Sequence, residues 1–212
     1  MKSIEEVEAV GFMDVGIPYP MFFADQGILE ERFVTWSMIS LGKALNSTLL
    51  TSSDATISVL EQRRQATLSK IRELCVGVPD YSAFCMAAQE ACSKNPYDVS
   101  FLRFYSVQLE SEIPQLVLES STPANSKEEE DTDSIKQMLQ GALSADEPIF
   151  LEAGDGSLPL QWQDLALGQG FSCRAEKAVI SRLQHDGTHK VYGLVVLGLN
   201  IRRHLDLSLI HI

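Results

Sequence analysis

Cysteine is the residue type in this 212-residue chain whose chemistry could most directly serve a site. The chain has four cysteines, Cys75, Cys85, Cys92 and Cys173, and no two of them form a Cys-x-x-Cys pair. Cys85 and Cys92 are spaced to share one face of a helix. We therefore interpret the four as ordinary buried thiols rather than as metal ligands or disulfide partners.

The four histidines lack the context that catalysis requires. His185 and His189 fall in an expected hairpin turn, His204 follows a strand, and His211 lies near the end of the sequence. No acidic helical segment surrounds any of them, as a phosphoacceptor histidine would require. We expect solvent-exposed or loop roles for all four.

Other motifs that carry chemistry are missing from the sequence. Residues 154–156, Gly-Asp-Gly, lack the GxxxxGK[ST] spacing of a phosphate-binding loop. There is no Gly-x-Ser-x-Gly elbow and no His-Glu-x-x-His pair. The acidic run at 127–133 lacks the spaced ligands and glycine of a calcium loop. The sequence thus predicts no catalytic residue and no metal site.

Composition favours a globular protein with one full domain and additional material. The chain is 45% hydrophobic and 22% charged, which is enough to bury a core. The net charge of -12 disfavours binding to nucleic acid or to an anionic membrane, since both require a basic surface. No stretch approaches the ~20 apolar residues of a membrane span, and the acidic N-terminus is unlike a signal peptide. We expect a cytoplasmic location.

Residues 1–52 read as a mixed region with one clear strand, at 32–39. Loops are marked by Gly16, Pro18, Pro20 and Gly27. Within the strand we expect Val34, Trp36 and Met38 to form the apolar face. One strand cannot bury that face alone, so this segment resembles the end of a larger domain.

A helix is expected at 54–75, with Asp54 as its cap. Its heptad core positions are Ile57, Leu60, Arg64, Thr67, Ile71 and Leu74. Two interpretations remain open: the helix packs on its own domain, or it forms a parallel dimer that joins two domains.

The rest of the chain alternates between helices and strands. A helix begins at Asp80 or Tyr81 and runs through Ser93, and Asn95-Pro96 ends it. Strands at 101–108 and 115–120 form a hairpin. After a solvated loop at 121–133, we expect a helix at 134–143 capped by Ser134, a strand at 148–152, and a loop through Trp162. Strands at 177–183 and 191–199 form a second hairpin, and the last is buried on both faces.

Two of these stretches resemble GAF domains of large fungal and bacterial hybrid sensor histidine kinases. NPYDVSFLRFYSV (95–107) is similar to the family's NP.D.PFALLYL strand entry. KAVISRL (177–183) followed by YGLVVLGLNIRRHLD (192–206) is similar to its AVVLPL…G.LVLGLNPRRPYD closing hairpin. The resemblance implies an α+β fold with a GAF-like antiparallel sheet flanked by helices.

The upstream sequence resembles other parts of the same kinases. FVTWSMIS (33–40) is similar to the last strands of a PAS domain, and EQRRQATL (61–68) to the signalling helix ERR..TL. These resemblances imply a partial PAS-like segment at 1–52, a linker helix at 53–75 and a GAF domain at 76–206. Residues 207–212 read as an atypical tail, so the terminal GAF helix is expected to be missing.

The family resemblance implies a regulatory sensor rather than an enzyme. A ligand pocket could be walled by Phe101, Tyr105, Phe150, Trp162 and Phe171. The sequence identifies no cofactor, and Cys173 alone does not make a bilin site. The expected partners are a small-molecule ligand and a second copy bound through residues 54–75. Alternatives are an enzyme resembling the free methionine sulfoxide reductases and a ligandless dimerisation scaffold.

Overall fold

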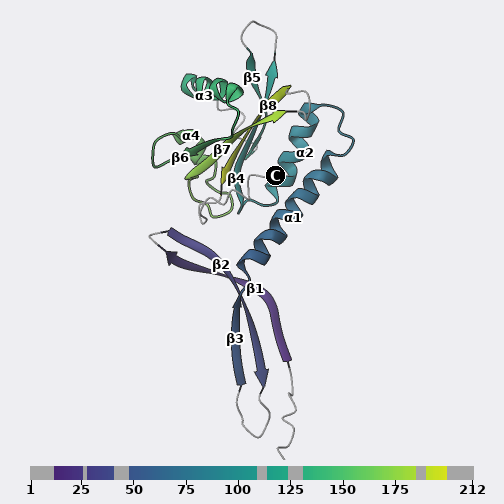
Figure 1. Ribbon diagram of the computed structural model, residues 1–212, viewed down its shortest axis with the longest axis vertical. Helices are drawn as coiled ribbons and strands as arrows, with labels where there is room; N and C mark the ends of the chain where they lie inside the picture. Colours follow the sequence, from purple (N-terminus) through teal and green to yellow (C-terminus); the bar gives the residue numbers. More distant parts are fainter. Residues whose placement is uncertain are drawn as a thin grey trace, which may run out of the picture. The chain divides into compact units, whose positions relative to one another are not determined.

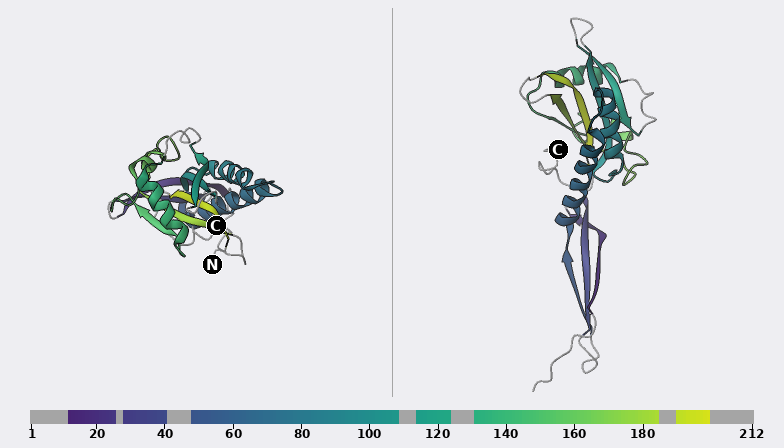
Figure 2. Two further views of the ribbon diagram at one scale, coloured as in Figure 1. Left: turned by 90° about the horizontal axis from the view of Figure 1, so that it is seen from above. Right: turned by 90° about the vertical axis from the view of Figure 1, so that its right-hand side faces the viewer.

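The computed structural model of the chain describes residues 12–25, 28–40, 48–108, 114–123, 131–184 and 190–199. The chain divides into two compact units, an N-terminal unit of residues 1–65 and a C-terminal unit of residues 66–212. Each unit has its own antiparallel sheet (Figures 1 and 2). The division falls inside the predicted linker helix, between Gln65 and Ala66.

The N-terminal unit contains a three-stranded sheet in the order β1-β2-β3. Its strands are β1 (Phe12–Asp25), β2 (Ile28–Ser40) and β3 (Thr48–Asp54). The predicted strand at 32–39 is confirmed within β2. The loops predicted at Gly16, Pro18 and Pro20 are wrong, because all three residues lie in β1. Gly16 and Pro18 fall where its pairing with β2 shifts between Val15 and Tyr19, and Pro20 pairs with Phe33. An edge strand tolerates proline at such an irregularity, since a missing N–H there breaks no central ladder. Gly27 lies outside the described residues.

The apolar face predicted for β2 is not the face that the described residues cover. Phe33, on the opposite face, is 4% exposed, whereas Trp36 is 38% exposed. Alternation along the strand does not reveal which face will be covered. Side chains from the following helix cover Phe33, as described below. The side chain of Met38 lies outside the described residues.

Helix α1 (Thr56–Cys75) confirms the helix predicted at 54–75. Asp54, predicted as the cap, lies one residue before the cap position, since the Ala55 carbonyl accepts from the Val59 N–H; Asp54 Oδ1 accepts a hydrogen bond from the Thr56 N–H at 2.8 Å. Hydrogen bonding to Thr56 lowers the pKa of Asp54. No residue of α1 is fully buried, and Ile57 is 86% exposed. In the described part of the chain, no helix has the length and apolar character needed to cross a membrane.

The C-terminal unit contains a five-stranded antiparallel sheet in the order β5-β4-β8-β7-β6. Its strands are β4 (Val99–Gln108), β5 (Gln115–Thr122), β6 (Ile149–Glu152), β7 (Lys177–Gln184) and β8 (Val191–Leu199). Both predicted hairpins are confirmed, and β8 is central, between β4 and β7. The unit thus has the predicted α+β, GAF-like fold of an antiparallel sheet flanked by helices.

Side chains on alternate positions of β4 and β8 bury opposite faces of this sheet. On one face Leu102, Phe104 and Val195 pack with helix α2 (Tyr81–Ser93) and with Ile71 and Cys75 near the end of α1. On the other face the core includes residues from α3 (Asp133–Ser144) and α4 (Leu160–Asp164). The predicted start of α2 is confirmed, since Asp80 Oδ1 accepts from the Ala83 N–H at 2.8 Å.

Two local predictions in the C-terminal unit are wrong. The cap residue of α3 is Thr132 rather than Ser134, and it makes no capping hydrogen bond with its side chain. Trp162 lies in α4 rather than in a loop, and it is completely buried. The five-residue α4 is too short to show a helical hydrophobic period, so burial of Trp162 against the sheet determines its conformation.

A substitution at Gly193 tests how closely the central strands pack. A Cβ at this position would meet the Tyr105 carbonyl oxygen and the Tyr81 hydroxyl, which are themselves hydrogen-bonded at 3.0 Å. We expect Gly193→Ala to lower the free energy of unfolding by about 1–3 kcal/mol or more in urea titrations. Gly154→Ala is the matched control, because a Cβ there meets no atom within 4 Å. Equal stability of the two variants would contradict this packing.

Candidate functional site

A buried polar cluster lies on β4, on the face of the sheet that α3 and α4 cover. Arg103 is 1% exposed and donates a hydrogen bond from Nε to the Tyr105 hydroxyl at 2.8 Å. Tyr105 in turn donates to Asp131 Oδ2 at 2.8 Å. Arg103 Nη2 and Asp131 Oδ1 form an ion pair at 3.3 Å. We call these three residues the Arg103 cluster.

The electrostatics of the Arg103 cluster keep Tyr105 neutral. Burial is the main cause that raises the pKa of the Tyr105 phenol, and the nearby carboxylate of Asp131 raises it further, against the opposing charge of Arg103. The phenol therefore remains a hydrogen-bond donor to Asp131 at physiological pH. The sequence-based prediction of a solvated loop at 121–133 is wrong for Asp131, whose side chain is 9% exposed because it pairs with Arg103.

The Arg103 cluster retains some hydrogen-bonding capacity. Arg103 Nη2 and Asp131 Oδ1 are close enough for an ion pair, but neither atom has a hydrogen-bond partner among the described residues. The indole N–H of Trp162, also buried, is likewise unpaired there. Buried polar atoms of this kind are satisfied by ordered water or by polar groups of a ligand.

The five aromatic residues predicted to wall a pocket occupy three different environments. Phe101, Tyr105 and Trp162 come together in the hydrophobic core between the sheet and the helices. Phe150 is 40% exposed on the edge strand β6. Phe171 is partly buried in the loop between α4 and β7, where it lines a pocket.

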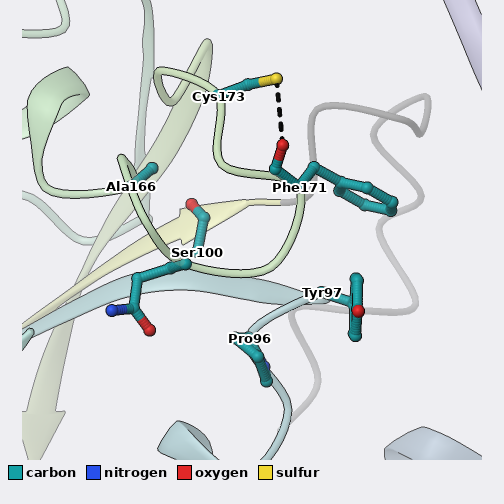
Figure 3. A pocket seen from close by; sticks show the side chains of 7 residues that line it. Pro96, Tyr97, Ser100, Ala166, Phe171 and Cys173 are labelled. Carbon is teal, nitrogen blue, oxygen red and sulfur yellow. Dashed lines mark hydrogen bonds between the residues drawn. The ribbon is translucent and has the colours of Figure 1, made fainter.

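That pocket lies between the start of β4 and the loop that precedes β7 (Figure 3). It is lined by Pro96, Tyr97, Ser100, Ala166, Gln169, Phe171 and Cys173. The rings of Tyr97 and Phe171 meet edge to face, with centroids 5.1 Å apart. The empty volume, including the open mouth, is about 210 Å³. Much of this space is open solvent at the mouth, and the enclosed part has room for about one water molecule.

Backbone geometry explains how the pocket loop reaches β4. Gly170 has a φ of +42°, and a Cβ there would meet the carbonyl of Pro96, so only glycine allows this approach. Cys173 donates from Sγ to the Phe171 carbonyl at 3.3 Å, which holds its thiol beside the loop. Sequence reasoning missed Tyr97, Ser100 and Gln169 as pocket residues. The glycines at 168 and 170, which flank Gln169, were the available signal.

A second set of contacts fixes the start of α1 in the N-terminal unit. Arg63 forms an ion pair with Glu31 at 3.4 Å, and its guanidinium lies 4.7 Å from the centroid of the Phe33 ring. The Phe33 N–H donates to Thr56 Oγ1 at 2.9 Å, and the Phe33 carbonyl accepts from the Ala55 N–H at 2.7 Å. Glu31 is 3% exposed, so the pair is shielded from water. We call these contacts between β2 and the start of α1 the α1 joint.

The second half of α1 has its own contacts within the C-terminal unit. Thr67 Oγ1 accepts a hydrogen bond from Asn95 Nδ2 at 3.0 Å, and Asn95 also donates to Asp98 at 2.9 Å. Ile71 and Cys75 pack against the hydrophobic cluster that α2 forms with β4 and β8. Asn95 therefore both follows the end of α2 and connects it to α1.

The thiols show no reactive arrangement among the described residues. Burial raises the pKa of Cys85 to about 12 and that of Cys92 to about 11, and it also raises the pKa of Cys75. These thiols stay protonated near neutral pH, as expected for packing residues. Within the described residues, no group of three or more His, Cys, Asp or Glu side chains is placed to hold a metal ion. All four histidines lie outside the described residues.

Comparisons with known proteins give little further information. No family model matches the chain, and no curated protein matches it. Among solved structures, the chain is similar to the chromophore-binding domain of the Stigmatella aurantiaca bacteriophytochrome in the Pr state, at 12% identity and a TM-score of 0.36. The match covers 86% of this chain and 65% of that structure. Similarity at this level identifies neither a ligand nor a function.

Replacing Arg103 measures how much the Arg103 cluster contributes to the stability of the fold. Arg103→Met leaves the Asp131 carboxylate without its cation, so we expect the free energy of unfolding to fall by about 3–5 kcal/mol. Arg182→Met is the control, because Arg182 pairs with an Asp146 that is 98% exposed, and its loss should cost less than about 1 kcal/mol. Urea unfolding followed by circular dichroism measures both. Similar losses would show that the Arg103 cluster contributes no more than a surface pair.

Proposed function

We propose that this chain is a regulatory sensor module of a two-component signalling histidine kinase, which binds a small ligand or a partner and relays its state through α1. The observation that carries the proposal is the placement of α1. Its first half is held by the α1 joint in the N-terminal unit, and its second half by Asn95 and α2 in the C-terminal unit. One continuous helix therefore belongs to both units.

A helix anchored in this way supports transmission by population shift. A ligand that prefers one arrangement of α1 by about 1–3 kcal/mol changes the balance between two states. Tilting or rotating the helix would separate Arg63 from Glu31 and from the Phe33 ring, so the α1 joint distinguishes the two arrangements. A parallel homodimer through residues 54–75 would use the exposed Ile57 at the start of the heptad series, whereas Thr67 and Ile71 of that series already contact the C-terminal unit.

Hydrogen exchange of α1 tests the relay. We expect Arg63→Met to speed amide exchange in the first turns of α1 and to leave the turns after Thr67 unchanged, because only the first half contacts β2. Arg72→Met is the control, since Arg72 is an exposed residue of the same helix. Uniform changes along α1 in both variants would contradict a separately anchored first half.

Mass spectrometry of the purified protein tests the sensor role. A small molecule that co-purifies, and that alters exchange at residues 54–75 when added back, supports ligand sensing. A ligandless protein whose only property is dimerisation supports the scaffold alternative. For the kinase context, a downstream coding sequence with a phosphoacceptor helix of the Ser-His-Glu-Leu-Arg-Thr-Pro type is the expected finding.

The pocket position of Cys173 favours one alternative, an enzyme resembling the free methionine sulfoxide reductases. The Cys173 thiol would take the sulfoxide oxygen and become a sulfenic acid, leaving the thioether. Against this, Cys85 and Cys92 are buried in α2 and remain protonated. We expect wild type and Cys173→Ser to show the same absence of free methionine sulfoxide reduction with a dithiol reductant. Activity that depends on Cys173 would favour the enzyme.

A further inference from the structure

Strand β3 presents an open edge in the N-terminal unit. It is the last strand in the order β1-β2-β3 and pairs only with β2 among the described residues (Figure 1). The side chains of residues 49–54 are exposed, including Leu49 at 46% and Leu50 at 60%. An edge strand carries a row of backbone donors and acceptors that another strand can match.

The direction of these backbone groups follows from the pairing of β2 with β3. Asp54 lies opposite Val34, and the next residue, Ala55, donates its N–H to the Phe33 carbonyl at 2.7 Å. Backbone groups alternate in direction along an antiparallel strand. Ala55, Ser53 and Thr51 therefore direct their backbone groups toward β2, whereas Ser52 and Leu50 direct theirs away from it.

This edge lacks the features that usually prevent pairing. Residues 48–53 contain no charged residue and no proline. The other edge strand, β1, contains Pro18 at an irregularity in its pairing and Pro20 shortly after it. Charges, prolines and bulges are the common means of protecting a strand edge. The two edges of this sheet therefore differ, and β3 is the one suited to accept a strand.

We propose that β3 pairs antiparallel with β3 of a second copy of this chain, about a two-fold axis at Thr51. A two-fold axis makes the same edge serve both copies. Centring at Thr51 uses the whole strand and places the outward-directed groups of Leu50 opposite those of Ser52 in the other copy. Ser52 and Leu50 thereby exchange hydrogen bonds across the axis, and the joined sheet has six strands.

Charge on β3 does not oppose this register for two copies of an acidic chain. Asp54 is the only charged residue of β3, and in this register it lies opposite Thr48 of the other copy. The two Asp54 carboxylates then lie about 20 Å apart at opposite ends of the paired strands. That separation is well beyond the Debye length of about 8 Å at physiological salt, so the carboxylates do not oppose pairing.

Burial of exposed leucine adds to the backbone hydrogen bonds. Leu50 of one copy lies diagonal to Leu50 of the other, at the roughly 7–8 Å spacing across which long side chains meet. Leu50 and Trp36 also share one face of the sheet, because the register pairs Ser52 with Trp36. The pairing therefore reduces the exposure of an apolar face. It requires no ligand and does not depend on the proposed sensor function.

Cysteine cross-linking in the full chain tests the register. In Thr51→Cys the two introduced thiols face each other across a pair with Cα atoms about 4.5 Å apart, within disulfide range. Ser53→Cys is the matched control, since it lies on the same face and strand but about 14 Å from its counterpart. We expect mild oxidation to convert Thr51→Cys to a covalent dimer, at levels well above Ser53→Cys and wild type. Equal cross-linking in all three would overturn the proposal.

A second variant and exchange measurements keep the proposal testable if the cysteine variants fold poorly. Ser52→Pro removes an outward N–H without breaking the β2–β3 ladder. We expect it to lower association at least tenfold in sedimentation velocity, with an unchanged circular dichroism spectrum. In wild type, exchange at Leu50 and Ser52 should slow as protein concentration rises. Protection of both amides at every concentration would show that the same chain covers the edge, and would overturn pairing between copies.

Discussion

The pairing of β4 with β8 is the constraint on which the C-terminal unit depends. Both faces of each strand are buried. Successive residues, which point to opposite faces, must therefore be mostly apolar. Gly198 shows how close the packing is, because a Cβ there would meet the Phe101 ring. The pair also determines where polar groups lie. Arg103 is buried because β4 is an inner strand of the sheet, and Asp131, from the segment before α3, neutralises it.

Helix α1 makes stabilising contacts in both units. A long helix with no fully buried residue gains little stability from its own sequence and depends on contacts at its two halves. Arg63 supplies an ion pair and a ring contact in the N-terminal unit, and Thr67 with Ile71 supplies contacts in the C-terminal unit. Both α1, which the proposed relay uses, and β3, which has the open edge, have few packing partners within the described chain.

Much of the fold followed from local patterns. Asp80 and Asp54 were recognisable as helix starts, and Asn95-Pro96 as a helix end, because capping and chain-breaking depend on nearest neighbours. The hairpins of the C-terminal unit followed from strand pattern and turn residues. The errors fell where local patterns are ambiguous. β1 crosses glycine and proline, and the short α4 carries no helical period, so only pairing and burial determine those segments.

The sequence by itself determined the order of most helices and strands, the absence of motifs for phosphate transfer, and the acidic character of the chain. Only the tertiary structure decided which side chains meet. Arg103, Tyr105 and Asp131 come together because β4 lies beside the segment that enters α3, and Arg63 covers Phe33 because α1 starts beside β2. Periodicity specifies which residues share a face, but it carries no information on what covers that face. That depends on contacts between residues far apart in the sequence.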